Sequence, residues 1–115
     1  MRSEQRSELI DAYFSAMDDE RHDLFEKVLA NDVVYQMGDN EMHGVNEVRS
    51  FFEAGVMSNT NHNAPRRIHS EWGSVCEGTY SAIVDGQGEV EGEFADVFEF
   101  DDNEERIIRV SIYTR

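Results

Sequence analysis

Hydrophobic residues in the first half of the chain recur at the spacing of amphipathic helices. Apolar positions three and four residues apart predict a helix over residues 3–17 and a shorter one over residues 24–29. A third helical stripe covers residues 45–52, between two glycines that are typical of helix ends. Residues 33–37 are rich in β-branched and aromatic side chains, which predicts a strand followed by a turn at residues 38–40.

After residue 65 the apolar pattern changes to a period of two, which is the period of half-buried strands. The expected strands cover residues 66–77, 79–85, 89–100 and 106–114, with turns at Gly78, at 86–88 and at 101–103. Such short connections allow only hairpins, so these strands are expected to form an antiparallel meander. The polar segment 58–65 that precedes them is interpreted as the one long loop.

The order of these elements, α-α-β-α-β-β-β-β, fits one domain over residues 1–115, because this length has room for one core. That order resembles the nuclear transport factor 2-like superfamily, and specifically its SnoaL-like and ketosteroid-isomerase-like branch. The phrases that carry the resemblance are LIDAYFSAM, ANDVVY, HGVNEVRSFF, FADVFEFD and IIRVSIY. The resemblance implies an α+β fold in which three N-terminal helices pack in the concave face of a bent, mostly antiparallel sheet.

The superfamily includes many activities, so the resemblance is specific for the fold and much less so for function. It implies a pocket for an apolar small molecule. The pocket would belong either to a cofactor-independent acid–base enzyme (of isomerase, cyclase or dehydratase type, acting on a cyclic or carbonyl-bearing substrate) or to a non-catalytic ligand-binding or dimerisation module. It also implies a homodimer that pairs through the sheet.

Charge narrows the choice of partners. The chain has 25 acidic and 10 basic residues, a net charge of -15, and Lys27 is its only lysine. Carboxylates spread along the whole chain repel nucleic-acid phosphates and anionic lipids, so neither is expected as a partner. Such a surface resembles proteins of salt-loving organisms, where salt screens the repulsion, and the alternative is an ordinary acidic cytoplasmic protein. No apolar stretch is long enough to predict a membrane span.

Asp96 is the residue most informative about function. It alternates with Phe94, Phe98 and Phe100, which puts a carboxylate on the same side of a strand as three aromatic rings. An ionised carboxylate in such surroundings is destabilising unless it is paired, hydrogen-bonded or protonated. We therefore favour an Asp96 that lines the pocket. The alternative is a solvent-facing Asp96, with the aromatic side at a dimer interface or a bulge that shifts the register.

Tyr13, on the apolar face of the first predicted helix, is the expected partner of Asp96. A tyrosine in that place is usually a core residue. The resemblance implies more, because Tyr13 and Asp96 fall where ketosteroid isomerases keep an oxyanion-binding tyrosine and a protonated aspartate. Met37 stands where those isomerases carry the aspartate that moves the proton. A thioether cannot act as a base, so steroid isomerisation by that mechanism is not expected.

His69 is the candidate for the missing base. Its alternation with Arg67 and Glu71 favours a solvent or interface face, and only a bulge would turn it inward. SnoaL-type cyclases use Asp and His on the sheet without a cofactor, which the resemblance implies here for Asp96 and His69. His62 is assigned to the polar loop. The candidates for pocket walls, each of which is also a possible core or interface residue, are Tyr35, Met37, Phe52, Trp72, Tyr80, Phe94, Phe98 and Tyr113.

No cofactor and no metal are expected. Residues 86–88 form a hairpin turn rather than a phosphate-binding loop, and the four histidines and single cysteine lack zinc-site spacing. The lone Cys76 excludes an internal disulfide, which fits a reducing, cytoplasmic environment, and it is interpreted as a small buried apolar residue.

Overall fold

The computed structural model describes residues 2–115. Along this part of the chain the elements are α1 (Ser3–Asp18), the 3-10 turn η1 (His22–Leu24), α2 (Phe25–Val28), β1 (Leu29–Met37), β2 (Asn40–His43), α3 (Val45–Glu53), β3 (Met57–His69), β4 (Ser74–Val84), β5 (Gly88–Phe100) and β6 (Ile107–Thr114). The short strand β2 was not expected. It folds back on β1 through a tight turn in which Gly38 has a positive φ of 59°, a conformation that glycine adopts without strain.

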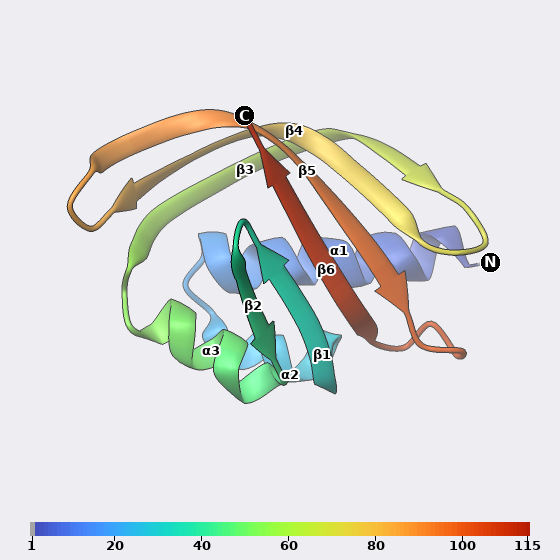
Figure 1. Ribbon diagram of the computed structural model, residues 1–115. Coiled ribbons are helices and arrows are strands. Elements are labelled where there is room, and N and C mark those ends of the chain that lie inside the picture. The colour runs from blue at the N-terminus through green and yellow to red at the C-terminus, as the bar shows by residue number, and fades with distance from the viewer. Residues whose placement is uncertain (1) are drawn as a thin grey trace.

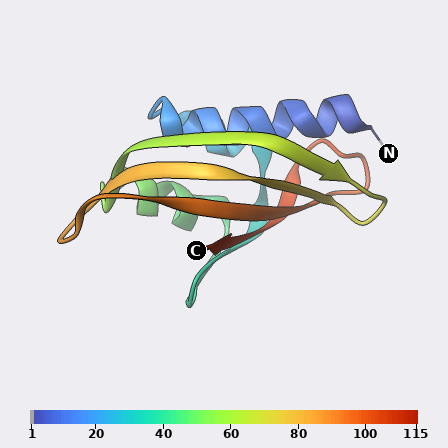
Figure 2. The ribbon, with the colours of Figure 1, turned by 90° about the horizontal axis from the view of Figure 1, so that it is seen from above.

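All six strands belong to one sheet, in the order β2-β1-β6-β5-β4-β3. Neighbouring strands are antiparallel except β1 and β6, which run parallel. The sheet bends over the helices, so that α1 lies beneath the arch of β3, β4 and β5 and runs alongside β3 (Figures 1 and 2). This confirms the expected α+β fold with helices on the concave face. None of the helices in residues 2–115 is long and apolar enough to cross a membrane.

The core lies between α1 and the inner face of the central strands. Tyr13 of α1 is fully buried, and its ring meets the ring of Phe98 on β5 edge-on, with 5.5 Å between centroids. Near the other two helices, Phe25 stacks on Phe52 with 5.2 Å between centroids. Removing a large apolar side chain of this kind from water contributes about 1.5–3 kcal/mol, so these contacts hold the helices against the sheet. Cys76 is fully buried, as its interpretation as a small apolar residue requires.

The prediction of a loop over residues 58–65 is wrong, because these residues form the first half of β3. Gly78 is not a turn either but lies within β4, where a Cβ atom would stand 1.8 Å from the carbonyl oxygen of Asn63. The hairpin turn lies instead between β3 and β4, at residues 70–73. The sequence pattern hides β3 because its side chains are mostly polar and two register shifts interrupt its pairing with β4.

The predicted orientation of Arg67 and His69 toward solvent or an interface is also wrong. Arg67 Nη2 donates to Asp11 Oδ1 of α1 over 2.5 Å, and His69 Nδ1 lies 2.7 Å from Ser74 Oγ. Ile68, between them, faces the other way and is 65% exposed. Polar contacts with α1 and β4 accompany the observed orientation. Alternation over a few residues identifies two faces without saying which of them is buried.

A buried ion pair joins α1 to the β5–β6 loop. Arg6 is 3% exposed, and its Nε donates to Glu104 Oε2 over 2.7 Å. Its Nη1 donates to the carbonyl oxygens of Ser70 over 2.5 Å and of Gly73 over 3.0 Å. The guanidinium also lies over the ring of Phe100, 4.9 Å from its centroid. One side chain thus connects α1, the β3–β4 turn and the β5–β6 loop.

Candidate functional site

A cavity of about 380 Å³ lies between α1 and the inner face of the sheet. Side chains from α1, from all strands except β2 and from the β4–β5 hairpin form its wall, which is mainly apolar and includes three methionines. The lining residues are Tyr13, Met17, Tyr35, Met37, Met57, Thr60, His62, Tyr80, Ser81, Ala82, Val84, Gln87, Val90, Phe94, Asp96, Ile112 and Thr114.

Asp96 lies in the middle of β5, in register with Cys76 of β4 and Ile112 of β6. It is 2% exposed, and Phe94 and Phe98 on the same face of the strand are buried with it. Its Oδ1 atom has no hydrogen-bond partner among residues 2–115. Burial raises the pKa of Asp96 to about 8, so that at pH 7 the group is mainly the neutral acid. A neutral acid has an O–H group with which it can donate a hydrogen bond.

Tyr13 and Tyr35 form a hydroxyl pair in the cavity wall. Their oxygens are 2.5 Å apart, and both side chains are fully buried. Burial raises the pKa of each phenol, and the nearby carboxyl of Asp96 raises both further, so both keep their protons at neutral pH. Two hydroxyls that share one hydrogen bond use only one of their two hydrogens. The other O–H group of the pair remains available as a donor.

His62 of the cavity wall pairs with Asp18, which is not itself a lining residue, at the junction of β3 with the end of α1. Asp18 Oδ1 lies 2.7 Å from His62 Nδ1 and accepts from Thr60 Oγ1 over 2.8 Å, while Asp18 Oδ2 accepts from the backbone N–H of His62 over 2.9 Å. The His62 ring stacks on Phe14 and meets Phe94 edge-on, with centroids 5.0 and 5.3 Å away. These contacts on several sides set the position of the imidazole.

Six of the predicted site and wall residues line the cavity, namely Tyr13, Tyr35, Met37, Tyr80, Phe94 and Asp96. Tyr113 does not, and its side chain is exposed. Phe98 and Phe52 are buried in the core but are not part of the cavity wall. The prediction that Trp72 forms a wall is wrong, because it lies in the β3–β4 turn and is 60% exposed. The misplaced strand boundaries around Gly78 caused that error.

His69 lies outside the cavity, beside the buried ion pair of Arg6. The pKa of His69 is lowered by partial burial and by the guanidinium groups of Arg6 and Arg67. Its ring contacts Ser74 instead of any group in the cavity wall. The structure therefore does not bring His69 together with Asp96, and the role of base that was considered for it has no geometric support.

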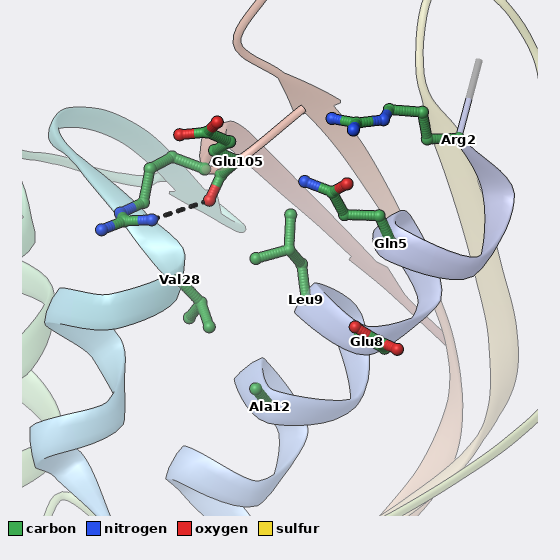
Figure 3. Close-up of a pocket in the computed structure, with 8 residues that line it drawn as sticks. Arg2, Gln5, Glu8, Leu9, Ala12, Val28 and Glu105 are labelled. Carbon is green, nitrogen blue, oxygen red and sulfur yellow. Dashed lines mark hydrogen bonds between the residues drawn. The ribbon is translucent and has the colours of Figure 1, made fainter. Parts of the chain in front are cut away.

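A second hollow, of about 520 Å³, lies between α1, the end of α2 and the β5–β6 loop. Figure 3 shows Arg2, just before α1, and Gln5 and Glu8 of α1 around the apolar side chain of Leu9, with Glu105 across from them. It is an open groove, and half of its eight lining residues are charged. None of the residues predicted for the site lies in it, so the cavity around Asp96 is the better candidate for function.

The described part of the chain, residues 2–115, has no group of three or more His, Cys, Asp or Glu side chains that could hold a metal ion. His62 and Asp18 are only a pair, and they bind each other. What the cavity offers to a ligand is a carboxylic acid, phenol hydroxyls and an imidazole, in an otherwise apolar wall.

The sequence profile of the SnoaL-like domain matches residues 10–110, which is most of the chain. The chain belongs to the SnoaL-like domain family. No curated protein sequence matches it. The expected resemblance to this branch of the superfamily is thereby confirmed.

Solved structures with the same fold share little sequence with this SnoaL-like chain. An LEH-like epoxide hydrolase from M. tuberculosis is 22% identical, with a TM-score of 0.82 over 96% of this chain and 83% of that one. An NTF2-like protein from Exiguobacterium is 14% identical, with a TM-score of 0.78 over 93% and 98%. A protein with a ketosteroid isomerase-like fold from Catenulispora acidiphila, in complex with trimethylamine, is 14% identical, with a TM-score of 0.80 over 92% and 84%. At such identities the similarity establishes the fold alone.

Sequence reasoning missed His62 in this SnoaL-like domain. The histidine was assigned to a loop, because the surrounding residues 58–65 are polar and contain a proline. One signal was present: if residues 58–65 form a strand, His62 shares its face with Thr60 and Ala64. The partner that makes His62 informative, Asp18, is 44 residues away in sequence, and only the packing of α1 on β3 brings the two together.

Proposed function

We propose that the cavity binds a mainly apolar small molecule with an oxygen acceptor, and that the neutral acid of Asp96 donates the hydrogen bond that orients it. The observation that carries the proposal is the buried Oδ1 atom of Asp96, which has no partner within residues 2–115. Buried polar atoms are nearly always hydrogen-bonded, and leaving one unpaired costs about 1–3 kcal/mol. A ligand that supplies the missing partner to this carboxyl group recovers part of that free energy.

The tyrosine pair supports the same orientation of the ligand. Tyr13, Tyr35 and Asp96 all line the cavity, and the carboxyl of Asp96 is close enough to raise the pKa of both phenols. Two neutral donors directed at one oxygen stabilise negative charge as it develops on that oxygen. Apolar walls around them exclude water, which strengthens both hydrogen bonds.

This set of groups supports cofactor-independent acid–base chemistry of the isomerase, cyclase or dehydratase type, on a cyclic or carbonyl-bearing substrate. The mycobacterial structural neighbour is described as an epoxide hydrolase, so a related fold is associated with chemistry on an oxygen-bearing small molecule. The second candidate is a non-catalytic binding module. Met37 favours it, because this cavity-lining residue supplies no base where the ketosteroid isomerases have one.

The affinity for a ketone is expected to depend on the protonation of Asp96. With 2-tetralone as the probe, we expect binding at pH 6 that weakens as the pH rises through about 8, because an ionised carboxylate only accepts hydrogen bonds. Asp96→Leu removes the donor at similar volume. Its affinity at pH 6 is expected to be about tenfold lower, with no dependence on pH. NMR titrations between pH 6 and pH 9 measure both effects.

The matched control is Asp102→Leu, which changes an exposed carboxylate in the β5–β6 loop and should bind like the parent. Tyr13→Phe is expected to cause a smaller loss, because Tyr35 keeps its hydroxyl. A Kd for 2-tetralone that is the same from pH 6 to pH 9 contradicts the proposal. Binding of trimethylamine that strengthens with pH, without binding of the ketone, contradicts it as well and assigns the cavity to amines.

We also infer that a second copy of the chain covers the convex face of the sheet. The strand register aligns Val97, Val75 and Ile68 in one apolar row across β5, β4 and β3, on the face away from the helices. Beside this row lies an exposed ion pair, in which Arg66 Nη1 is 2.8 Å from Glu77 Oε1, so a positive and a negative charge flank the apolar residues. An apolar row flanked by both charges is complementary to itself, as a twofold interface requires.

The net charge of -15 opposes association at low salt, and we propose that this surface is adapted to high salt. Light scattering in molar KCl is expected to give the mass of a dimer, with a larger monomer fraction in low salt. Ile68→Asp should give a monomer under both conditions. Val56→Asp, at an exposed apolar residue before β3, should behave like the parent. A monomeric parent in molar KCl is incompatible with this interface.

A further inference from the structure

The hydrogen-bond pattern around Asp18 defines the tautomer of His62. A carboxylate has no hydrogen to donate, so the 2.7 Å contact requires His62 Nδ1 to be the donor to Asp18 Oδ1. A neutral ring that carries its hydrogen on Nδ1 has its lone pair on Nε2. Within residues 2–115 the ring makes one hydrogen bond, the contact of Nδ1 with Asp18, and the side chain lines the cavity. When the ring is neutral, the wall therefore contains an imidazole nitrogen with a lone pair that is not used within residues 2–115.

The stability of α1 does not explain why an aspartate stands at position 18. Asp18 is the last residue of the helix, where the negative end of the helix dipole disfavours a carboxylate. Its hydrogen bonds run instead to β3, to the hydroxyl of Thr60 and to the backbone and ring of His62. The arrangement orients an imidazole, at some electrostatic cost to the helix.

Aromatic contacts place this imidazole on the same wall as the acid. The His62 ring meets Phe94 edge-on, with centroids 5.3 Å apart, and Phe94 is two residues from Asp96 on the same face of β5. His62 is also in register with Tyr80, another lining residue. Asp96 and His62 thus line the same cavity, which offers a ligand a donor from one and an acceptor from the other.

We propose that His62, oriented by Asp18, is the general base of the cavity, and that the protein abstracts a proton from a carbon next to a carbonyl group. The inference rests on the proposed function, because Asp96 must first hold the carbonyl oxygen. The resemblance places the base at position 37, on β1, where this chain has a methionine. His62 lies on β3, so the proposed base comes from a different strand.

The step balances without a cofactor or a second reactant. The lone pair of His62 Nε2 takes the proton, and the C–H bond breaks. Its electron pair forms a carbon–carbon double bond, while the carbonyl π electrons move to the oxygen, which the Asp96 O–H stabilises. The imidazolium, paired with Asp18, then returns the proton to the same carbon or to a conjugated one. The substrate class is an enolisable ketone that is mainly apolar.

Hydrogen–deuterium exchange of 2-tetralone in D₂O, followed by ¹H NMR, tests the proposal. The parent protein is expected to accelerate deuterium incorporation next to the carbonyl. His62→Gln should lower the rate at saturating ketone by about 100-fold or more, with little change in Kd. Asp18→Asn should lower the rate less, and ¹⁵N NMR should show that His62 no longer keeps its hydrogen on Nδ1 alone. His43→Gln, at a histidine with a side chain 64% exposed, is the control and should match the parent.

The failures of the two proposals are distinguishable. If 2-tetralone binds but exchanges at the rate of buffer, or if folded His62→Gln exchanges it at the parent's rate, the general base is overturned while the binding function stands. If the ketone does not bind, both proposals fall. Should His62→Gln not fold, the ¹⁵N spectrum of the parent decides: a hydrogen on Nε2 overturns the assignment, and a hydrogen on Nδ1 with the rate loss of Asp18→Asn supports it.

Discussion

Replacing Asp96 with asparagine is expected to make the protein more stable relative to the parent, by an amount that grows as the pH rises from about 4 to about 9. Burial raises the pKa of Asp96 from 3.8 to about 8. Between these values the unfolded chain releases the proton while the folded protein keeps it, so the free energy of unfolding of the parent falls with pH. The difference between the two pKa values corresponds to on the order of 5 kcal/mol above pH 8.

Urea denaturation of parent and variant at pH 4, 6 and 9 measures this effect as the difference between the two unfolding free energies. The acidic surface also weakens the fold at high pH, but it does so equally in both proteins. Asp102→Asn, at an exposed site, is the control, and its difference from the parent should stay constant. Parallel pH profiles for the parent and Asp96→Asn would mean that Asp96 is solvated or paired in solution.

Replacing Arg6 with methionine is expected to lower the free energy of unfolding by about 3–5 kcal/mol. The change keeps much of the apolar stem but leaves Glu104 without the guanidinium that it binds over 2.7 Å. It also removes the donor to the carbonyl oxygens of Ser70 and Gly73. Unpaired buried groups of this kind account for the large effect. Thermal and urea unfolding at pH 7 measure it.

Two further variants separate the buried pair from an ordinary surface ion pair. Arg66→Met breaks the exposed pair with Glu77, and we expect a change below about 1 kcal/mol. In Arg6→Met/Glu104→Gln the unpaired carboxylate is removed as well, so the double variant should recover part of the stability. Equal effects of Arg6→Met and Arg66→Met would show that burial of the first pair contributes nothing.

The period-two pattern of β5 was the most reliable local signal. Three phenylalanines in alternation with Asp96 determine that the acid shares their face, since neighbouring side chains of a strand point to opposite sides. The structure places Phe94, Phe98 and Asp96 together in the interior, as this alternation predicted. The predicted helices at residues 3–17 and 45–52 also lie close to α1 and α3, because their apolar stripes are continuous.

The polar half of β3 gave no comparable signal. Without a run of alternating apolar residues, residues 58–65 could not be distinguished from a loop, and Gly78 was taken for the turn that follows. The close approach of Gly78 to Asn63 exists only in the paired strands. His62 and Trp72 were misplaced for the same reason, one outside the site and the other inside it.

The sequence by itself predicted the helices and the face that Asp96 shares with its phenylalanines, because hydrophobic periodicity is a local property of each element. The fold class followed from the resemblance to the superfamily, and an inward Asp96 was the favoured of two alternatives. Only the tertiary structure decided which polar groups meet in the cavity. Asp18 reaches His62 across 44 residues, and the hydroxyls of Tyr13 and Tyr35 meet across 22. These contacts depend on the docking of α1, on register shifts in β3 and on the parallel pairing of β1 with β6. None of these is encoded in the spacing of residues along one element.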